Sequence, residues 1–128
     1  MTLELWMLLG SSMLLFVLIM VQQLQVDLTM GVKYAVSNRE EAKPSTGMSG
    51  RIDRAILNLR ENLLLFATVV LVLATAEISN GATRNGSILF FVARIVHAVT
   101  YVLGITGIRS LAWFAGIVGI GIMLSALF

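Results

Sequence analysis

Hydrophobic positions run almost without interruption through four stretches of the chain, and short polar segments separate them. The stretches cover residues 5–26, 55–78, 87–103 and 111–128. Each is close to the roughly 20 apolar residues that a helix needs to cross a bilayer. The pattern predicts an all-α integral membrane protein in which residues 1–128 form a single four-span domain.

The segments between the apolar runs predict how the helices connect. "NGATRNG" (80–86) and "GITGIRS" (104–110) predict tight glycine turns between antiparallel helices. The segment 27–50 is longer, mixed in charge, and contains the only proline. Short connections favour antiparallel neighbours, so the expected fold is a four-helix bundle. The sequence leaves open the role of the 27–50 segment and of the glutamines at the end of the first run.

Small residues recur four positions apart in the last apolar run. The pairs are Ala112 and Gly116, Ala115 and Gly119, and Gly121 and Ser125. Such spacing permits close contact between helices in a membrane. It fits packing within one subunit slightly better than a seam between subunits.

Composition excludes an ordinary soluble domain and several kinds of site. Of the 128 residues, 58% are hydrophobic and only 12% are charged. The start, "MTLELWMLLG", has neither the basic leader nor the cleavage site of a signal peptide, so we expect the first run to remain as a span. With no cysteine and one histidine, a metal site or a disulfide is not expected.

Positive charge is concentrated on one side of the predicted bundle. The first connection and the start of the second helix hold Lys33, Arg39, Lys43, Arg51 and Arg54. Arg109 adds to the same side, whereas the other side offers only Arg84. Since Lys and Arg are enriched on cytoplasmic loops, we expect this side to face the cytoplasm and both termini to face away from it. No basic domain lies outside the membrane, so nucleic-acid binding is not expected.

Polar residues share one face of the second helix and one face of the third. On the second helix this stripe consists of Arg51, Arg54, Asn58 and Glu61. On the third helix it consists of Arg94, His97 and Tyr101. The spacings of three and four keep each stripe on a single helical face. Two helices therefore each present polar groups to a common interior.

Depth along the helices relates the two stripes to each other. At 1.5 Å per residue, Glu61 and Arg94 lie about equally far, roughly 15 Å, from the predicted cytoplasmic surface. An unpaired charge at that depth is costly. We therefore predict an ion pair between Arg94 and Glu61, with His97 and Asn58 level with each other nearer the surface.

The stripes allow more than one function. Buried ion pairs often only hold helices together, and a lone histidine is more often a hydrogen-bonded core residue than a catalyst. Against this stands the convergence of Arg51, Arg54, Arg94 and Arg109 at one end, which fits an anionic ligand bearing carboxylates. A non-catalytic structural or accessory protein is the alternative. An ion pathway is less favoured because polar residues fade in the outer half of every helix.

Two segments carry a resemblance to a known family. "RIDRAILNLREN" resembles the Arg-x-x-Arg-Ala-x-x-Asn-x-x-Glu signature of the MAPEG family, the membrane-associated proteins in eicosanoid and glutathione metabolism. "ARIVHAVTYVLGITGIRSLAW" is similar to the family's third helix and the turn after it. The chain departs from some members at Ile56 and Leu57, where they have basic residues, and at Arg39, where eukaryotic members have proline. It looks more like bacterial members, so a bacterial inner membrane is expected.

The resemblance implies a homotrimer of four-helix subunits with glutathione bound between neighbours near the cytoplasmic face. It implies a glutathione-dependent transferase or peroxidase whose lipophilic second substrate, an apolar electrophile or a lipid hydroperoxide, arrives through the bilayer. The residues expected to bind glutathione are Arg51, Arg54, Asn58, Glu61, Arg94, His97 and Ser110. Arg109 and Tyr101 are expected to ionise the thiol, because the thiolate is the reactive form.

Overall fold

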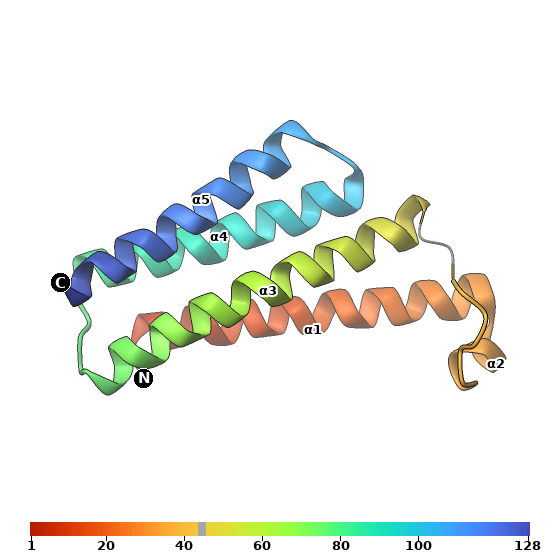
Figure 1. Cartoon of the computed structure of the whole chain (residues 1–128), viewed down its shortest axis with the longest axis horizontal. Coiled ribbons are helices and arrows are strands. Elements are labelled where there is room, and N and C mark those ends of the chain that lie inside the picture. The colour runs from red at the N-terminus through yellow and green to blue at the C-terminus, as the bar shows by residue number, and fades with distance from the viewer. Residues whose placement is uncertain (44–45) are drawn as a thin grey trace.

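The computed structural model describes residues 1–43 and 46–128, and every regular element in these ranges is helical (Figure 1). The four long helices are α1 (Leu3–Met30), α3 (Gly47–Thr75), α4 (Gly81–Leu103) and α5 (Gly107–Leu124). A single helical turn, α2 (Val32–Ala35), follows α1, and a short 3₁₀ segment (Ser125–Leu127) follows α5. The predicted all-α four-helix fold is confirmed.

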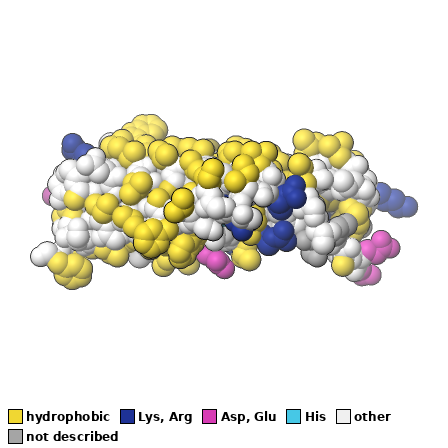
Figure 2. Space-filling view, turned by 90° about the horizontal axis from the view of Figure 1, so that it is seen from above, with side chains coloured by type: hydrophobic (Ala, Val, Ile, Leu, Met, Phe, Trp, Pro, Cys, Tyr) yellow, Lys and Arg dark blue, Asp and Glu magenta, His cyan; other side chains and the backbone are white. Residues whose placement is uncertain are grey.

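The outside of the bundle is apolar. Each of the four long helices is long and apolar enough to cross a membrane, so the chain is a multi-pass integral membrane protein. On α1 the large side chains Trp6, Met13, Phe16 and Leu24 are all more than half exposed. Figure 2 shows hydrophobic side chains over much of one face. Lipid would cover such a surface in place of water.

The bundle has two distinct ends (Figure 1). Both termini and the α3–α4 connection lie at one end, which we call the terminal end. The other end, which we call the loop end, holds α2, the start of α3 and the α4–α5 turn. On the face in Figure 2, several Lys and Arg side chains lie toward the loop end.

The predicted turn at 80–86 is wrong, because α4 already begins at Gly81. The Asn80 side chain accepts hydrogen bonds from the backbone N–H groups of Ala82 and Thr83. In return, the Thr83 hydroxyl accepts a hydrogen bond from the Asn80 backbone N–H at 2.9 Å. This reciprocal capping box starts the helix despite two nearby glycines.

The predicted connection at 104–110 is also shorter than expected. Gly104, at a φ of 78°, ends α4 in the left-handed conformation that glycine adopts without strain. Because α5 starts at Gly107, Arg109 and Ser110 lie in its first turn instead of in a loop. Their side chains therefore take directions set by a helix.

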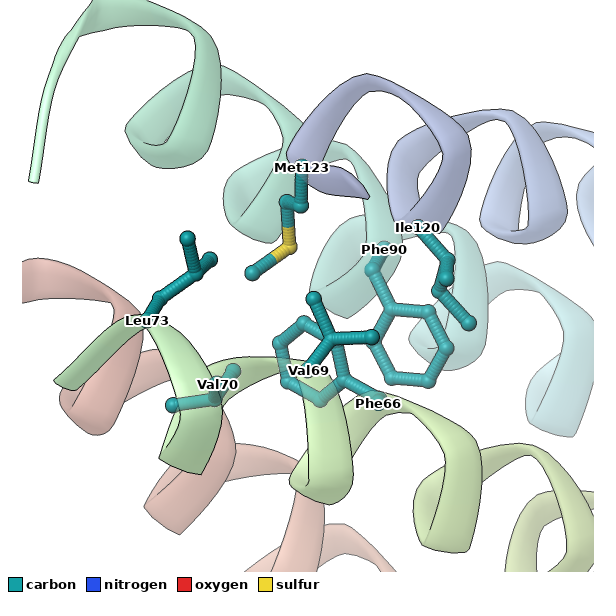
Figure 3. Close-up of a cluster of buried hydrophobic side chains, with 7 residues drawn as sticks. All are labelled: Phe66, Val69, Val70, Leu73, Phe90, Ile120 and Met123. Atoms are coloured by element: carbon teal, nitrogen blue, oxygen red, sulfur yellow. The ribbon is translucent and has the colours of Figure 1, made fainter. Parts of the chain in front are cut away.

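The core differs between the two ends. Toward the terminal end it consists of the seven side chains in Figure 3: Phe66, Val69, Val70, Leu73, Phe90, Ile120 and Met123. The rings of Phe66 and Phe90 stack with centroids 3.9 Å apart. Toward the loop end, the cluster of buried apolar side chains in the described residues consists of Leu18, Ala55, Leu59 and Ala98. Since two of these are alanines, space remains there for polar side chains.

A buried carboxylate that the sequence analysis did not single out holds the terminal end together. Glu4, near the start of α1, is 2% exposed. It accepts hydrogen bonds from the hydroxyls of Thr83 and Ser79, which belong to α4 and to the connection before it. The contact ties α1 to the start of α4, because a buried carboxylate needs donors to replace water.

Candidate functional site

A pocket of about 290 Å³ opens at the loop end between three helices. Its wall is formed by Asn58 from α3, His97 and Tyr101 from α4, and Arg109, Ser110 and Trp113 from α5. All but Trp113 were singled out from the sequence. The pocket lies where the core side chains are small and where α5 begins.

Helical spacing explains how these residues share one pocket. His97 and Tyr101 are four residues apart on α4, and Arg109 and Trp113 are four residues apart on α5. Residues four apart lie one above the other on the same face of a helix. Each helix therefore contributes a polar residue and an aromatic ring to the same side.

The guanidinium of Arg109 lies over an aromatic ring. Its guanidinium carbon is 4.4 Å from the centroid of the Tyr101 ring, a distance typical of cation–π contacts. The Tyr101 ring in turn meets His97 edge to face, with centroids 5.4 Å apart. Within the described part of the chain, Arg109 makes no hydrogen bond or ion pair. The ring holds the guanidinium in place while its N–H donors remain available to a ligand.

The predicted ion pair between Arg94 and Glu61 is wrong within the chain. Arg94 is 1% exposed, and its Nη1 donates to Asn58 Oδ1 at 3.1 Å. Its Nη2 donates to the backbone carbonyls of Trp113, at 3.1 Å, and Ala112, at 3.5 Å. Oxygen atoms one turn nearer the loop end, together with α5 carbonyls, thus replace the expected carboxylate.

Glu61 lies on the outer face of α3 and is exposed. It lines a shallow depression with Arg60, Leu63 and Leu64, away from the pocket that contains Asn58. The sequence stripe placed Glu61 on the same side as Asn58, but three residues turn a helix by only about 300°. The resulting offset is enough to carry the carboxylate out of the interior.

Two further predicted site residues, Arg51 and Arg54, lie outside the pocket wall. The Nε of Arg51 donates to the Val102 carbonyl oxygen at 2.9 Å and so joins the start of α3 to the end of α4. Arg54 is exposed near the same end. Within the pocket wall, the Ser110 hydroxyl donates to the Thr106 carbonyl oxygen at 3.3 Å.

The glutamines at the end of α1 have different roles. Gln22 is buried, and its Nε2 donates to Asp53 Oδ1 at 2.5 Å. Lys43 forms an ion pair with the same carboxylate at 2.8 Å, the only one between side chains of the described residues. Gln23 donates to Asp27 and accepts from Arg39. The segment after α1 is thereby pinned to the start of α3.

Trp113 and the role of Gly116 were not predicted from the sequence. Trp113 could have been found, because it lies four residues after Arg109 and so on the same face of α5. The spacing in the last apolar run pointed to Gly116 as a site of close helix contact, but not to the Arg94 side chain as the group that it meets. A Cβ atom at position 116 would lie 2.6 Å from Arg94 Nη2, so only glycine leaves room for the buried guanidinium.

Comparison with protein families matches residues 3–128, nearly the whole chain, to the MAPEG family. The match includes all four long helices and every residue of the pocket wall. Comparisons with curated proteins and with solved structures found no match.

Proposed function

The chain belongs to the MAPEG family, and from this we propose that it is a glutathione-dependent membrane transferase or peroxidase. Its second substrates are apolar electrophiles or lipid hydroperoxides that reach the site from the bilayer. The observation that carries the proposal is the pocket at the loop end. There, three helices bring together a guanidinium that makes no hydrogen bond or ion pair with the described residues, an amide, an imidazole and two hydroxyls.

The chemistry that this pocket offers is stabilisation of an anion. Glutathione carries two carboxylates, and its thiol reacts as the thiolate. The guanidinium of Arg109, held on the Tyr101 ring, supplies N–H donors for the developing thiolate. Tyr101 supplies a hydroxyl at the same place. Asn58, His97 and Ser110 remain to bind the peptide part of the ligand.

The two reactions share the thiolate as nucleophile. In the transferase reaction, the sulfur forms a bond to an electrophilic carbon, and the leaving group departs with the bonding electrons. In the peroxidase reaction, the sulfur attacks the terminal peroxide oxygen and releases the lipid alcohol after protonation. The sulfenic acid formed on glutathione then reacts with a second glutathione to give the disulfide and water.

Glutathione binding is the most direct test. In detergent, adding glutathione should raise the melting temperature of the wild-type protein in a saturable way, since a ligand that binds the folded state stabilises it. Glutathione lacking the thiol, with alanine in place of cysteine, should bind through the same carboxylates. No shift with either peptide, together with no turnover of an aryl halide or a lipid hydroperoxide, would contradict the proposal.

We further propose that the protein is a homotrimer with the pocket facing the cytoplasm of a bacterium. Arg60 and Glu61 support assembly, because both are exposed near the middle of α3, where a charge facing lipid is costly. A neighbouring subunit would cover them. The cations at the loop end support the orientation.

Native mass spectrometry in a mild detergent should therefore show a trimer as the main species. Replacing both exposed charges, Arg60→Leu with Glu61→Leu, tests whether they lie at the subunit seam. A wild-type spectrum containing only monomer or dimer would overturn the trimer.

The alternative is a non-catalytic membrane protein whose polar groups only join helices. One observation favours it: Arg94 and Arg51 both donate hydrogen bonds to oxygen atoms of other helices. Arg109 distinguishes the two functions, because it has no such partner in the described chain. A structural protein would not need, at the mouth of a pocket, a guanidinium that the described residues leave without a hydrogen-bond partner.

A further inference from the structure

Arg94 lies behind the wall of the pocket and not in it. Its side chain is 1% exposed, and it is absent from the residues that line the pocket. Its guanidinium nevertheless contacts two residues that do line it, through the Asn58 side chain and the Trp113 carbonyl oxygen. From its place on α4, Arg94 thus joins the α3 wall of the pocket to the α5 wall.

The contact determines which way the Asn58 amide faces. A side-chain amide has an oxygen that only accepts hydrogen bonds and a nitrogen that only donates them. A guanidinium only donates, so it selects the oxygen. Asn62 Nδ2 also lies within 3.4 Å of the same oxygen, as a second donor. The oxygen is therefore committed to the interior, and the nitrogen is the polar atom of Asn58 left for the pocket.

The charge of Arg94 is not cancelled by a carboxylate. Among the described side chains, the only ion pair is between Lys43 and Asp53. The partners of Arg94 are instead amide and carbonyl oxygens, and its Nε has no hydrogen-bond partner among residues 1–43 and 46–128. A buried cation without a counter-ion adds positive potential behind the pocket wall, which favours an anionic ligand in front of it.

We propose that Arg94 is a positioning residue, which holds Asn58 so that its amide N–H group points into the pocket and donates to a carboxylate of the ligand. This inference rests on the proposed function, with glutathione as the source of the carboxylate. It assigns ligand contact to Asn58 and not to Arg94. Gly116 is part of the same arrangement of Arg94 and Asn58, because it makes room for the guanidinium.

The Asn58→Asp variant separates two functions of the side chain: accepting a hydrogen bond from Arg94 and donating one to the ligand. Aspartate keeps an oxygen for Arg94 to bind, and the pair becomes an ion pair, so the melting temperature should equal or exceed that of the wild type. The N–H donor is replaced by a carboxylate oxygen that repels the ligand. Affinity for glutathione, measured by calorimetry in detergent, should fall at least about tenfold. A purely structural role of Asn58 predicts unchanged affinity in this variant, and that result would overturn the proposal.

A second comparison asks whether Arg94 acts through Asn58. The variants are Arg94→Met and the double change Arg94→Met with Asn58→Leu, which leave no buried charge unpaired. Both should bind glutathione about tenfold more weakly than the wild type and within about threefold of each other, because an Asn58 that is no longer held contributes little. If the double variant binds at least tenfold more weakly than Arg94→Met, the two residues act independently and the proposal fails.

Gly116→Ala tests the positioning of Asn58 by Arg94 without changing any residue of the pocket wall. The added methyl group would displace the Arg94 guanidinium, so glutathione affinity should fall severalfold. Gly121→Ala is the matched control, because a Cβ at position 121 meets nothing within 4 Å. Equal affinity in Gly116→Ala and Gly121→Ala would count against the positioning role.

The wild-type titration distinguishes failure of this inference from failure of the proposed function. If the wild type does not bind glutathione, the proposed function fails, and the assignment of a glutathione carboxylate to Asn58 fails with it. The melting temperatures of the variants then test on their own whether Arg94 holds the Asn58 side chain. This holding role predicts that Asn58→Asp melts at a higher temperature than Asn58→Leu, and the reverse order would overturn it.

Discussion

The Arg109→Ala variant should fold and assemble as the wild type does, yet turn over glutathione at least about tenfold more slowly. Arg109 makes no hydrogen bond to the described protein, so its removal strands no buried partner. It does contact the Tyr101 ring at 4.4 Å and lines the pocket. Loss of a preorganised donor for a developing anion commonly costs about 10²–10³ in rate. The measurement is the rate of conjugation to a generic aryl halide and of lipid hydroperoxide reduction.

Two control variants make the result specific. Arg84→Ala removes an exposed arginine at the terminal end and should leave turnover unchanged. Arg109→Lys keeps the charge but loses the planar fork that rests on the Tyr101 ring, so it should recover only part of the activity. Glutathione affinity should change much less than the rate, since the ligand carboxylates are bound elsewhere. Wild-type turnover in Arg109→Ala would remove Arg109 from the mechanism.

Much of the pocket could be predicted from the sequence, because the spacing of residues within one helix determines which of them share a face. The spacing between His97 and Tyr101 fixes their shared face wherever α4 packs. The same holds for Arg109 and Trp113 once α5 is known to begin at Gly107. Of the two stripes, Asn58, His97 and Tyr101 do face one interior, as expected for polar groups that avoid lipid, whereas Arg54 and Glu61 are exposed. These steps need no knowledge of distances between helices.

The partner of Arg94 could not be predicted in the same way. Depth along the helix placed it level with Glu61, but a long guanidinium also reaches the side-chain oxygen of Asn58, three residues nearer the loop end. Which oxygens it meets depends on how α5 packs against α4 and on the room that Gly116 leaves for the guanidinium. Backbone carbonyls are present on every helix and leave no mark in the sequence. The carboxylate was the visible candidate, and it was the wrong one.

The start of α4 shows a different limit. Two glycines and two asparagines at 80–86 suggested a turn, and the helix instead begins inside that segment. The deciding feature is the pair Asn80 and Thr83, whose side chains satisfy each other's backbone N–H groups. The Asn80 and Thr83 pair was present in the sequence, but the two glycines favoured the prediction of a turn.

Helices α4 and α5 approach each other closely through Gly86 and Gly119, and the second large effect is expected there. A Cβ at position 119 would lie 2.6 Å from the Gly86 carbonyl oxygen and 2.9 Å from the Phe90 backbone nitrogen. Both neighbours are backbone atoms of α4, which cannot rotate away as a side chain can. The Gly119→Ala variant must therefore push α5 away from α4, and with it the core around Phe90 and Met123 (Figure 3).

We expect Gly119→Ala to lower the free energy of unfolding by about 1–3 kcal/mol, the usual cost of overpacking a tight core. Gly121→Ala, on the same helix, meets open space and should be neutral or stabilising by up to about 1 kcal/mol, because alanine favours helix more than glycine does. The measurement is reversible unfolding of both variants by SDS titration in mixed micelles. Because α5 carries Arg109 and Trp113, Gly119→Ala should also reduce glutathione affinity, whereas Gly121→Ala should not. Equal stability of the two variants would mean that α4 and α5 do not meet through Gly86 and Gly119.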